Sequence, residues 1–425
     1  MSFNNKKLAY FGGKPLIKKR FKPYVVIGSK EIKATRRVIK SGVLTGFAGR
    51  WSKDFFGGPE VLKFEKYLRN FYKVKHAIVV NSWSSGLTAA VGALKINPGD
   101  EIIVTPWTFC ATATAILHWN AIPIFADISK DTFCINPEEV KKKITKKTRA
   151  IISPDIFGHP SNIKALKKII KGKNIKIITD SAHAPYSFYN GKITGTDSDI
   201  GGYSLNDQKH ITTGEGGIVV TNNDYFANRI RLLRNHAEAV VDGKKEKDIS
   251  NMIGFNFRMG EIEAAIGLEQ YKKLKKLIKE RDKIFSLLTK ELNKLPGIKT
   301  PTIKKNCTHN YFIYPIILDL KILKVKRNHI VKLLEAEGVE GLWPGYYNLH
   351  LTPVYQKKIA YGSKGFPWSK YNNSISYKKG ICPVAENLQE KNFLGFKAIM
   401  FDLKIKDIKN ISKAFQKIWK YLKII

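Results

Sequence analysis

The chain has 425 residues with a hydrophobic fraction of 43%, which fits a large globular domain with a smaller second one and excludes a disordered chain. Its formal net charge of +39 permits phosphate-bearing partners, but the excess is mostly Lys, spread along the chain, which indicates a composition bias rather than nucleic-acid binding. No apolar run reaches the roughly 18 residues that span a bilayer, and residues 1–10 show no secretory signal, so we expect a cytoplasmic protein without a membrane span. The four cysteines have no paired spacing, so we expect neither a disulfide framework nor a metal site.

From about residue 31 to residue 270, short strand-like runs alternate with helix-like stretches. The predicted strands are Ala77–Val80, Glu101–Val104, Ile122–Phe125, Ala150–Ser153, Ile175–Thr179 and Gly217–Thr221. The predicted helices between them are Glu60–Tyr72, Ser85–Leu94, Ala111–His118, Pro137–Lys143 and Ile163–Ile170. This alternation predicts an α/β fold with a mostly parallel central sheet covered on both faces, and ligand sites in the loops at the strand ends.

The pattern changes after a long amphipathic stretch over 260–295. A strand is predicted at Tyr311–Leu318, helices at Asn328–Glu337 and Ile405–Leu422, and a loop at Asn373–Asn387. We therefore expect a large α/β domain over residues 30–275. Residues 276–425, together with the N-terminal segment 1–29, are expected to form a smaller α+β domain.

Polar residues follow the first two predicted strands. At Asn81–Gly86 a strand passes into a helix, where free backbone N–H groups and the hydroxyls of Ser84 and Ser85 suit a phosphate. Simple helix capping by either serine fits this segment equally well. After the next strand, Thr105–Phe109 offers an aromatic face, although an aromatic residue at a strand end is more often part of the core.

Asp180 directly follows the predicted strand Ile175–Thr179 and is itself followed by Ser181-Ala182-His183-Ala184. A carboxylate in this place can keep a pyridine nitrogen protonated, which makes the ring an electron sink. Capping of the following turn is an equally good interpretation of Asp180 taken alone.

Lys209 lies in the segment Ser204-Leu205-Asn206-Asp207-Gln208-Lys209, before a Thr/Gly-rich turn at 212–217. The glycines of this turn allow a close approach to a ligand, and an amine that forms a Schiff base needs such a setting. An ordinary loop lysine is the simpler interpretation of Lys209, unless the neighbouring strand-end segments support a Schiff-base role.

Taken together, these segments resemble the DegT/DnrJ/StrS aminotransferases, enzymes of amino-sugar, aminocyclitol and polysaccharide biosynthesis. The resemblance covers almost the whole chain, from Gly12-Gly13 to the last helix. The ordered matches are Gly58–Glu65, Gly99–Val104, Asp180–Ala184, Thr212–Gly217, Arg234–His236 and Gly254–Arg258, followed by Glu263–Gly267.

The resemblance implies the fold of fold-type I pyridoxal 5′-phosphate (PLP) enzymes and a role for each matching residue. Lys209 is expected to form the Schiff base and move the proton, Asp180 to pair with the pyridine nitrogen, and His183 to approach the phenolic oxygen. The remaining expected cofactor contacts are Phe109 and Ala182 on the two ring faces, Trp83, Ser84 and Ser204 at the phosphate, and Asn256 at the phosphate site of a neighbouring subunit, which implies a homodimer.

The chain departs from the family at Trp83-Ser84, where Gly-Thr is common, and at His236-Ala237, where His-Gly is usual. Some relatives carry histidine in place of the lysine and are dehydratases, whereas here Lys209 occupies that position. The resemblance thus implies transamination, and the alternative is a PLP-binding regulatory or dehydratase-type relative.

The donor implied by the resemblance is L-glutamate or L-glutamine, and the acceptor is a keto group on a nucleotide-linked sugar or a ketocyclitol. The segments Leu8–Pro15 and Cys382–Glu386 look like the branch that contains ketocyclitol aminotransferases and aminohydroxybenzoate synthases. A nucleotide-sugar acceptor would instead require positive charge near the pocket, for which Lys14, Arg258 and His350 are candidates. Each of the three also has a purely structural interpretation.

Overall fold

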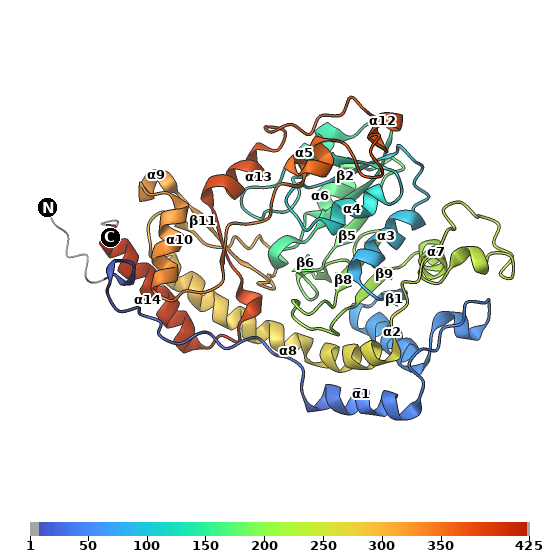
Figure 1. Ribbon diagram of the computed structural model, residues 1–425, viewed down its shortest axis with the longest axis horizontal. Coiled ribbons are helices and arrows are strands. Elements are labelled where there is room, and N and C mark those ends of the chain that lie inside the picture. Colours follow the sequence, from blue (N-terminus) through green and yellow to red (C-terminus); the bar gives the residue numbers. More distant parts are fainter. Residues whose placement is uncertain (1–7, 423–425) are drawn as a thin grey trace.

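The computed structural model describes residues 8–422, so residues 1–7 of the expected N-terminal segment and 423–425 of the expected smaller domain lie outside it. A seven-stranded sheet forms the larger part (Figure 1). Its strands, in spatial order, are β1 (His76–Val80), β9 (Gly217–Thr221), β8 (Ile200–Ser204), β5 (Lys176–Asp180), β4 (Thr148–Pro154), β2 (Glu101–Val104) and β3 (Ile122–Phe125).

The central sheet is mostly parallel. Strands β8, β5, β4, β2 and β3 pair in parallel, whereas β9 runs antiparallel to both of its neighbours. Because β5 and β8 are parallel, Asp180 and Ser204 come at the same edge of the sheet. The predicted strands are found within one or two residues; β8, with sequence Ile-Gly-Gly-Tyr-Ser, was not predicted.

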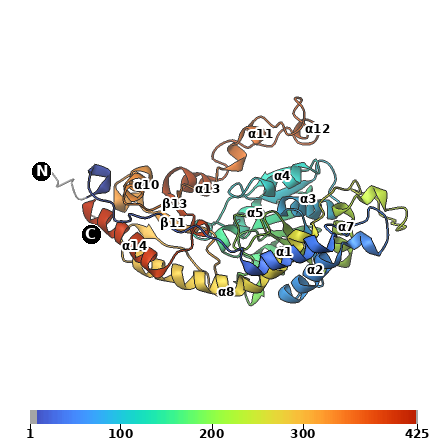
Figure 2. The same cartoon turned by 60° about the horizontal axis from the view of Figure 1, so that its bottom comes forward.

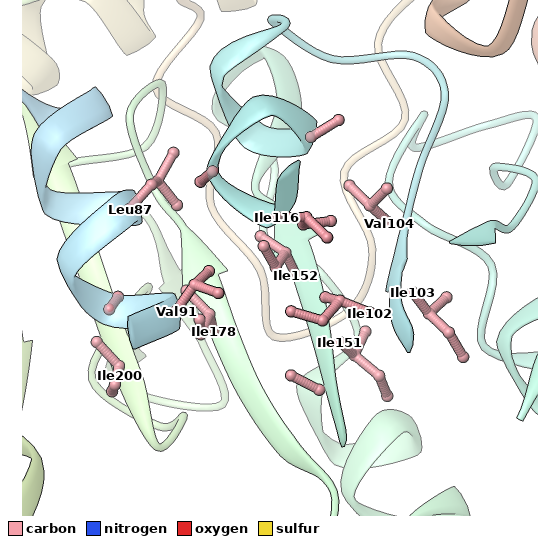
Figure 3. Close-up of a cluster of buried hydrophobic side chains, with 14 of the residues drawn as sticks. Leu87, Val91, Ile102, Ile103, Val104, Ile116, Ile151, Ile152, Ile178 and Ile200 are labelled. Atoms are coloured by element: carbon pink, nitrogen blue, oxygen red, sulfur yellow. The ribbon is translucent and has the colours of Figure 1, made fainter. Parts of the chain in front are cut away.

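Helices cover both faces of this sheet. In β1, Ile78 and Val80 pack into a core with helix α3 (Trp83–Ala93), while Ala77 and Val79 pack into a second core with α2 (Pro59–Tyr72) and α8 (Glu261–Leu292). This is the alternation expected of a strand buried on both sides. Figure 3 shows Leu87 and Val91 of α3 close to the isoleucines of the central strands. The other helices of this part are α1 (Ser29–Ser41), α4 (Ala111–Leu117), α5 (Pro137–Lys143), α6 (Ile163–Ile169) and α7 (Asp224–Arg234).

A smaller antiparallel sheet forms the second part, in the order β10 (Ile298–Lys299), β11 (Tyr314–Leu318), β13 (Phe393–Phe396) and β12 (Leu342–Trp343). It shares a core with the second half of α8, with α10 (Arg327–Ala336) and α14 (Ile405–Tyr421), and with residues 8–21. The α/β fold with a smaller C-terminal α+β part is therefore confirmed. Helix α8 runs along both parts and crosses the expected boundary at residue 275 (Figure 1).

Residues 349–388 belong to the C-terminal half of the sequence but pack on the large core. Their helices are α11 (Pro353–Gln356), α12 (Trp368–Tyr371) and α13 (Pro383–Asn387), and α11 and α12 extend over the side of the large part that carries α3 and α4 (Figure 2). The prediction of a loop over Asn373–Asn387 is thus wrong at its C-terminal end, because Pro383 begins the short helix α13 there. The remaining short elements are α9 (Leu320–Leu323), β6 (Phe188–Tyr189) and β7 (Lys192–Ile193). Within residues 8–422, no helix is long and apolar enough to cross a bilayer.

Candidate active site

A cavity of about 700 Å³ opens at the edge of the large sheet where β4, β5 and β8 end. Its size is that of a small-molecule or cofactor site. Eight of the nine residues expected to contact the cofactor line it: Trp83, Ser84, Phe109, Asp180, Ala182, His183, Ser204 and Lys209. The structure therefore brings together side chains that are up to 126 residues apart, since Trp83 and Lys209 meet in one cavity.

Lys209 lies in the turn after β8, where its backbone N–H donates to the Asn206 carbonyl oxygen at 3.0 Å. Its Nζ lies 4.4 Å from the centre of the Phe312 ring. Loss of solvent around the amine lowers the pKa of Lys209 from 10.5 to about 8, against the opposing attraction of the Asp180 carboxylate. A substantial fraction of the amine is therefore neutral near pH 8 and able to act as a nucleophile.

Asp180, at the end of β5, is buried and has hydrogen-bond donors on both carboxylate oxygens. The Trp83 indole Nε1–H donates to Oδ1 at 2.7 Å, as does the Ala182 backbone N–H at 3.2 Å. The Thr112 hydroxyl donates to Oδ2 at 2.8 Å. Such a set of donors holds a carboxylate in one orientation.

His183 stacks on Phe312, with ring centres 3.8 Å apart and planes at 9°. The backbone N–H of Phe157 donates to its Nδ1 at 3.3 Å, and Nε2 lies 3.4 Å from the Tyr346 hydroxyl. Burial, with help from the nearby Lys209 and His210, lowers the pKa of His183 well below 6.5. The imidazole is thus neutral, and because Nδ1 accepts, the proton is on Nε2.

The first turn of α3 forms the polar end of the cavity. The Ser82 hydroxyl caps this helix by accepting from the Ser85 backbone N–H at 3.1 Å, so the alternative of capping by Ser84 or Ser85 is not what the structure shows. The Ser84 and Ser204 side chains line the cavity beside it. Gly217 allows the close approach of β9, since a Cβ there would lie 2.5 Å from the Trp83 nitrogen.

The Phe109 ring is 57% exposed although it lines a concave cavity. An apolar ring left open in this way offers a stacking face. Combined with the first turn of α3 at Trp83 and Ser84, the carboxylate of Asp180 and the Lys209 amine, it gives the cavity a set of groups that fits a flat, cationic heteroaromatic ring bearing a phosphate and a carbonyl. The residues present therefore fit PLP.

Several cavity residues were not predicted from the sequence. Phe312, Trp343, Tyr346 and Lys397 come from the second half of the chain and line the cavity on the side of the smaller sheet. Trp343 and Tyr346 meet edge to face at 4.8 Å, and the Lys397 Nζ lies 5.9 Å from the Trp343 ring centre. No local motif marks these residues, because only long-range contacts bring them to the site.

Asp155 is a further residue that was not predicted. It directly follows β4 and lies next to Asp180, and its carboxylate accepts from the Ser181 hydroxyl at 2.6 Å and from the Ser161 backbone N–H at 2.7 Å. Burial raises the pKa of Asp155 to about 7, opposed by these hydrogen bonds. Its position directly after a buried strand was the signal that could have identified it.

The three cationic residues considered for an acceptor do not line the cavity. Lys14 is exposed in the N-terminal segment. Arg258 donates to Asn256 at 2.8 Å and to Asn235 at 3.2 Å. His350 is buried and hydrogen-bonds Glu386 at 2.9 Å. Arg258 and His350 thus each have a hydrogen-bond partner within the chain, outside the cavity.

Asn256 also lies outside the cavity of its own chain. It is exposed, and its backbone oxygen accepts from the Asn81 side chain at 3.3 Å.

Within the part of the chain that the structure describes, no group of three or more His, Cys, Asp or Glu side chains is placed to hold a metal ion.

Comparison with known proteins gives a consistent result. Residues 33–392 match the DegT/DnrJ/EryC1/StrS aminotransferase family. The chain is 34% identical to a GDP-perosamine synthase of Vibrio cholerae over 321 residues, which are 76% of this chain and 84% of that protein. It is 30% identical to the spore coat polysaccharide biosynthesis protein SpsC of Bacillus subtilis over 374 residues, 86% of this chain and 92% of that one. Among solved structures, Helicobacter pylori PseC, an aminotransferase involved in the biosynthesis of pseudoaminic acid, superposes with a TM-score of 0.77 and 26% identity over 95% of this chain and 100% of that chain.

Proposed function

The chain belongs to the DegT/DnrJ/EryC1/StrS aminotransferase family, and we propose that this PLP-dependent aminotransferase moves the amino group of L-glutamate or L-glutamine to a keto group of a nucleotide-linked sugar or a ketocyclitol. The observation that carries the proposal is the Lys209 amine, placed in one cavity with the Asp180 carboxylate and the open start of α3. A buried amine with a lowered pKa is the group that carbonyl chemistry on a protein requires.

The reaction would proceed in two halves, with the donor leaving as a 2-oxo acid before the acceptor is aminated. When bound, PLP supplies an electron-withdrawing ring that stabilises negative charge at the carbon that loses a proton. Lys209 would hold the cofactor covalently and, as a free amine, would take up and return the proton that the substrate Cα loses. Its pKa of about 8 suits a base that works near neutral pH.

The other cavity residues would hold and orient the cofactor. Asp180 would keep the ring nitrogen protonated, and the neutral His183 would donate its Nε2–H to the phenolic oxygen. Phe109 would stack on one ring face while Ala182 lies against the other. Ser84, Ser204 and the backbone N–H of Trp83 would bind the phosphate at the start of α3, where helix-end N–H groups point out of the helix.

For the acceptor, the cavity wall on the side of the smaller sheet favours a sugar with an attached anionic group. Trp343 and Tyr346 offer apolar faces to a pyranose ring, and Lys397 beside them offers a cation to a diphosphate. The GDP-perosamine synthase relative supports this nucleotide-linked acceptor. A ketocyclitol acceptor is supported by relatives named as putative scyllo-inosose aminotransferases, of which one is 29% identical.

A homodimer would complete the site. Asn256 lies on the surface, outside the cavity of its own chain, which suits a residue that reaches the phosphate of a neighbouring subunit. Exposed apolar side chains on α1 add to the case, since Ile32 is 66% exposed and Ile39 is 57% exposed.

The first test is the absorbance spectrum of the protein with PLP, recorded before and after L-glutamate or L-glutamine is added separately. We expect a visible band from PLP bound to Lys209, and its loss with one of the two donors as the cofactor takes up the amino group. Acceptors are then screened with that donor, beginning with keto nucleotide-sugars and continuing with ketocyclitols.

The alternative is a regulatory or dehydratase-type relative, and a pleiotropic regulatory protein of Geobacillus stearothermophilus is 30% identical over 338 residues. This alternative is supported if PLP gives the bound band but neither donor changes it. If no bound band forms, the assignment of Lys209 is wrong.

A further inference from the structure

The Trp83 side chain points away from the phosphate site to which its backbone was assigned. The indole is 4% exposed, and its Nε1–H donates to Asp180 Oδ1 at 2.7 Å. Trp83 begins α3, whereas Asp180 ends β5 in the middle of the sheet. The hydrogen bond therefore links the helix that would bind the phosphate to the carboxylate that would bind the ring nitrogen.

Two glycines make room for this indole. A Cβ on Gly86, in the same helix, would lie 2.7 Å from Trp83 Cε3, and a Cβ on Gly202, in β8, would lie 1.9 Å from Cζ3. Atoms that close would overlap, so any larger residue at Gly202 or Gly86 would displace the ring. The bulky ring of Trp83 is thus accommodated by its own surroundings in this chain.

The remaining donors on Asp180 come from two other elements. The Thr112 hydroxyl reaches Oδ2 at 2.8 Å from α4, and the Thr108 hydroxyl lies 3.1 Å from that of Thr112. The backbone N–H of Ala182 reaches Oδ1 at 3.2 Å. With Trp83 on one oxygen and Thr112 on the other, the plane of the carboxylate is fixed from two sides. Loss of Trp83 would leave Oδ1 with only the longer contact from the Ala182 N–H, and loss of Thr112 would leave Oδ2 without a side-chain donor, so either loss would loosen the orientation of the carboxylate.

We propose that Trp83 is a positioning residue for the transamination, whose indole N–H sets the orientation in which Asp180 meets the ring nitrogen of PLP. This rests on the role proposed above for Asp180. A phenylalanine in its place fills most of the space but lacks the N–H donor. The Trp83→Phe variant would therefore keep the fold but hold the carboxylate less firmly, through Ala182 and Thr112 alone.

The test is a double-mutant cycle of Trp83→Phe with Asp180→Asn, read out as the dissociation constant of PLP for each apoenzyme and as the rate of the donor half-reaction. Trp83→Phe alone should weaken PLP binding and slow the half-reaction by about tenfold each, the effect typical of one hydrogen bond to a charged group. In the Asp180→Asn background the same substitution should have less than about a twofold effect, because the group through which Trp83 acts has already changed.

Two further variants serve as controls. Thr112→Val removes the donor on the other oxygen and should resemble Trp83→Phe. Trp119→Phe removes a partly buried indole whose Nε1 donates to the Thr88 carbonyl oxygen at 2.7 Å, away from Asp180, and should leave PLP affinity unchanged. A loss in Trp119→Phe equal to that in Trp83→Phe would show that general packing is responsible and would overturn the proposal.

A measurement on the apoenzyme tests the contact without any substitution of Trp83. The indole N–H proton resonance of Trp83, assigned as the one missing in Trp83→Phe or by selective labelling, should move upfield in Asp180→Asn as a charge-assisted hydrogen bond is weakened. An unmoved resonance, or equal losses of PLP affinity in both backgrounds of the cycle, would refute the role of Trp83. If Asp180→Asn itself leaves PLP affinity and the half-reaction unchanged, then the role proposed for Asp180 is wrong, which is a separate outcome.

Discussion

Burial shifts the pKa values of the groups in the cavity in opposite directions. The pKa of Lys209 falls to about 8 and that of His183 falls well below 6.5, while the pKa of Asp155 rises to about 7, in each case chiefly through loss of solvent. Each shift moves the group toward its neutral form, and Asp180, with three donors, is the carboxylate proposed to face the ring nitrogen of PLP. This division suits a site in which one cationic ring nitrogen has to be bound and one amine has to be a nucleophile.

Replacement of Lys209 by alanine should abolish turnover. The variant lacks both the covalent attachment point and the base, so we expect kcat to fall by at least about 10²–10⁴-fold, the usual contribution of general acid–base catalysis alone. Thermal stability should not decrease, because the substitution removes a poorly solvated amine. Multiple-turnover kinetics and a thermal unfolding curve check these expectations, with the exposed Lys192, in β7, changed to alanine as control. Full activity in Lys209→Ala would contradict the assignment.

The pKa of Lys209 also predicts a pH dependence for capture of PLP by the apoenzyme. Only the neutral amine attacks a carbonyl, so the capture rate should rise with pH and level off above about 8, rather than near 10.5 as for an exposed lysine. Stopped-flow absorbance over pH 6–10 measures it. The sign for stability is the same: between pH 8 and 10.5 the unfolded chain binds more protons than the fold, so the free energy of unfolding of the apoenzyme rises with pH in this window.

At the scale of elements, a buried ion pair connects helix α7 with helix α2, and the same arginine also bonds strand β1. Arg234, at the end of α7, donates to the Glu65 carboxylate of α2 at 2.7 Å and to the Val79 carbonyl oxygen of β1 at 2.9 Å. Its side chain is fully buried. Arg234→Ala should lower the free energy of unfolding by about 3–5 kcal/mol, because a buried carboxylate is left without its partner.

The matched control for Arg234 is the exposed pair of Lys276 and Glu280, both in α8, whose side-chain atoms lie 3.9 Å apart. Lys276→Ala should lower the free energy of unfolding by about 0–1 kcal/mol, since solvent screens a surface pair. Urea unfolding of the two variants measures the difference. Equal losses of stability would show that the Arg234 pair contributes no more than a surface contact.

The helices and strands that the sequence predicted well are those with a clear apolar period. The strands β1, β2, β3 and β9 have continuous apolar runs and were predicted within a residue. Strand β8 was missed because its two glycines interrupt the apolar pattern. They are needed there by packing: a Cβ on Gly201 would lie 2.0 Å from the Gly195 carbonyl oxygen, and Gly202 makes room for Trp83. Local pattern does not contain that information.

The same limit applies to the site. Residues at strand ends of the large sheet, such as Asp180 and Lys209, were predicted because they belong to ordered local motifs. Phe312, Tyr346 and Lys397 were not, because they reach the cavity through packing between the smaller sheet and the large one. The Trp83 to Asp180 hydrogen bond was also missed, since a backbone role was expected at that position and the direction of a side chain is fixed only by its neighbours.

At the scale of the whole molecule, residues from both the large and the smaller part line the cavity. Asn256, which is expected to contact the cofactor phosphate, lies instead on the outer surface of the chain. Apolar side chains are exposed on the surface as well: Ile32 and Ile39 of α1, and Ile253, which is 76% exposed. A two-fold dimer that covers such a surface would let each subunit offer its Asn256 to the cavity of the other. Sedimentation of the protein at low concentration should therefore show a dimer.

A complementation experiment tests whether the active site is shared. Lys209→Ala and Asn256→Ala should each be inactive or nearly so as homodimers. When the two are unfolded together in equal amounts and refolded, half of the dimers are mixed, and each mixed dimer has one cavity with an intact Lys209 and an intact Asn256 from its partner, so activity should return to about a quarter of the wild-type value. Recovery near zero would mean that Asn256 acts within its own chain, and full activity of Asn256→Ala alone would remove it from the site. Only a dimer with shared sites predicts that two inactive proteins regain activity by mixing.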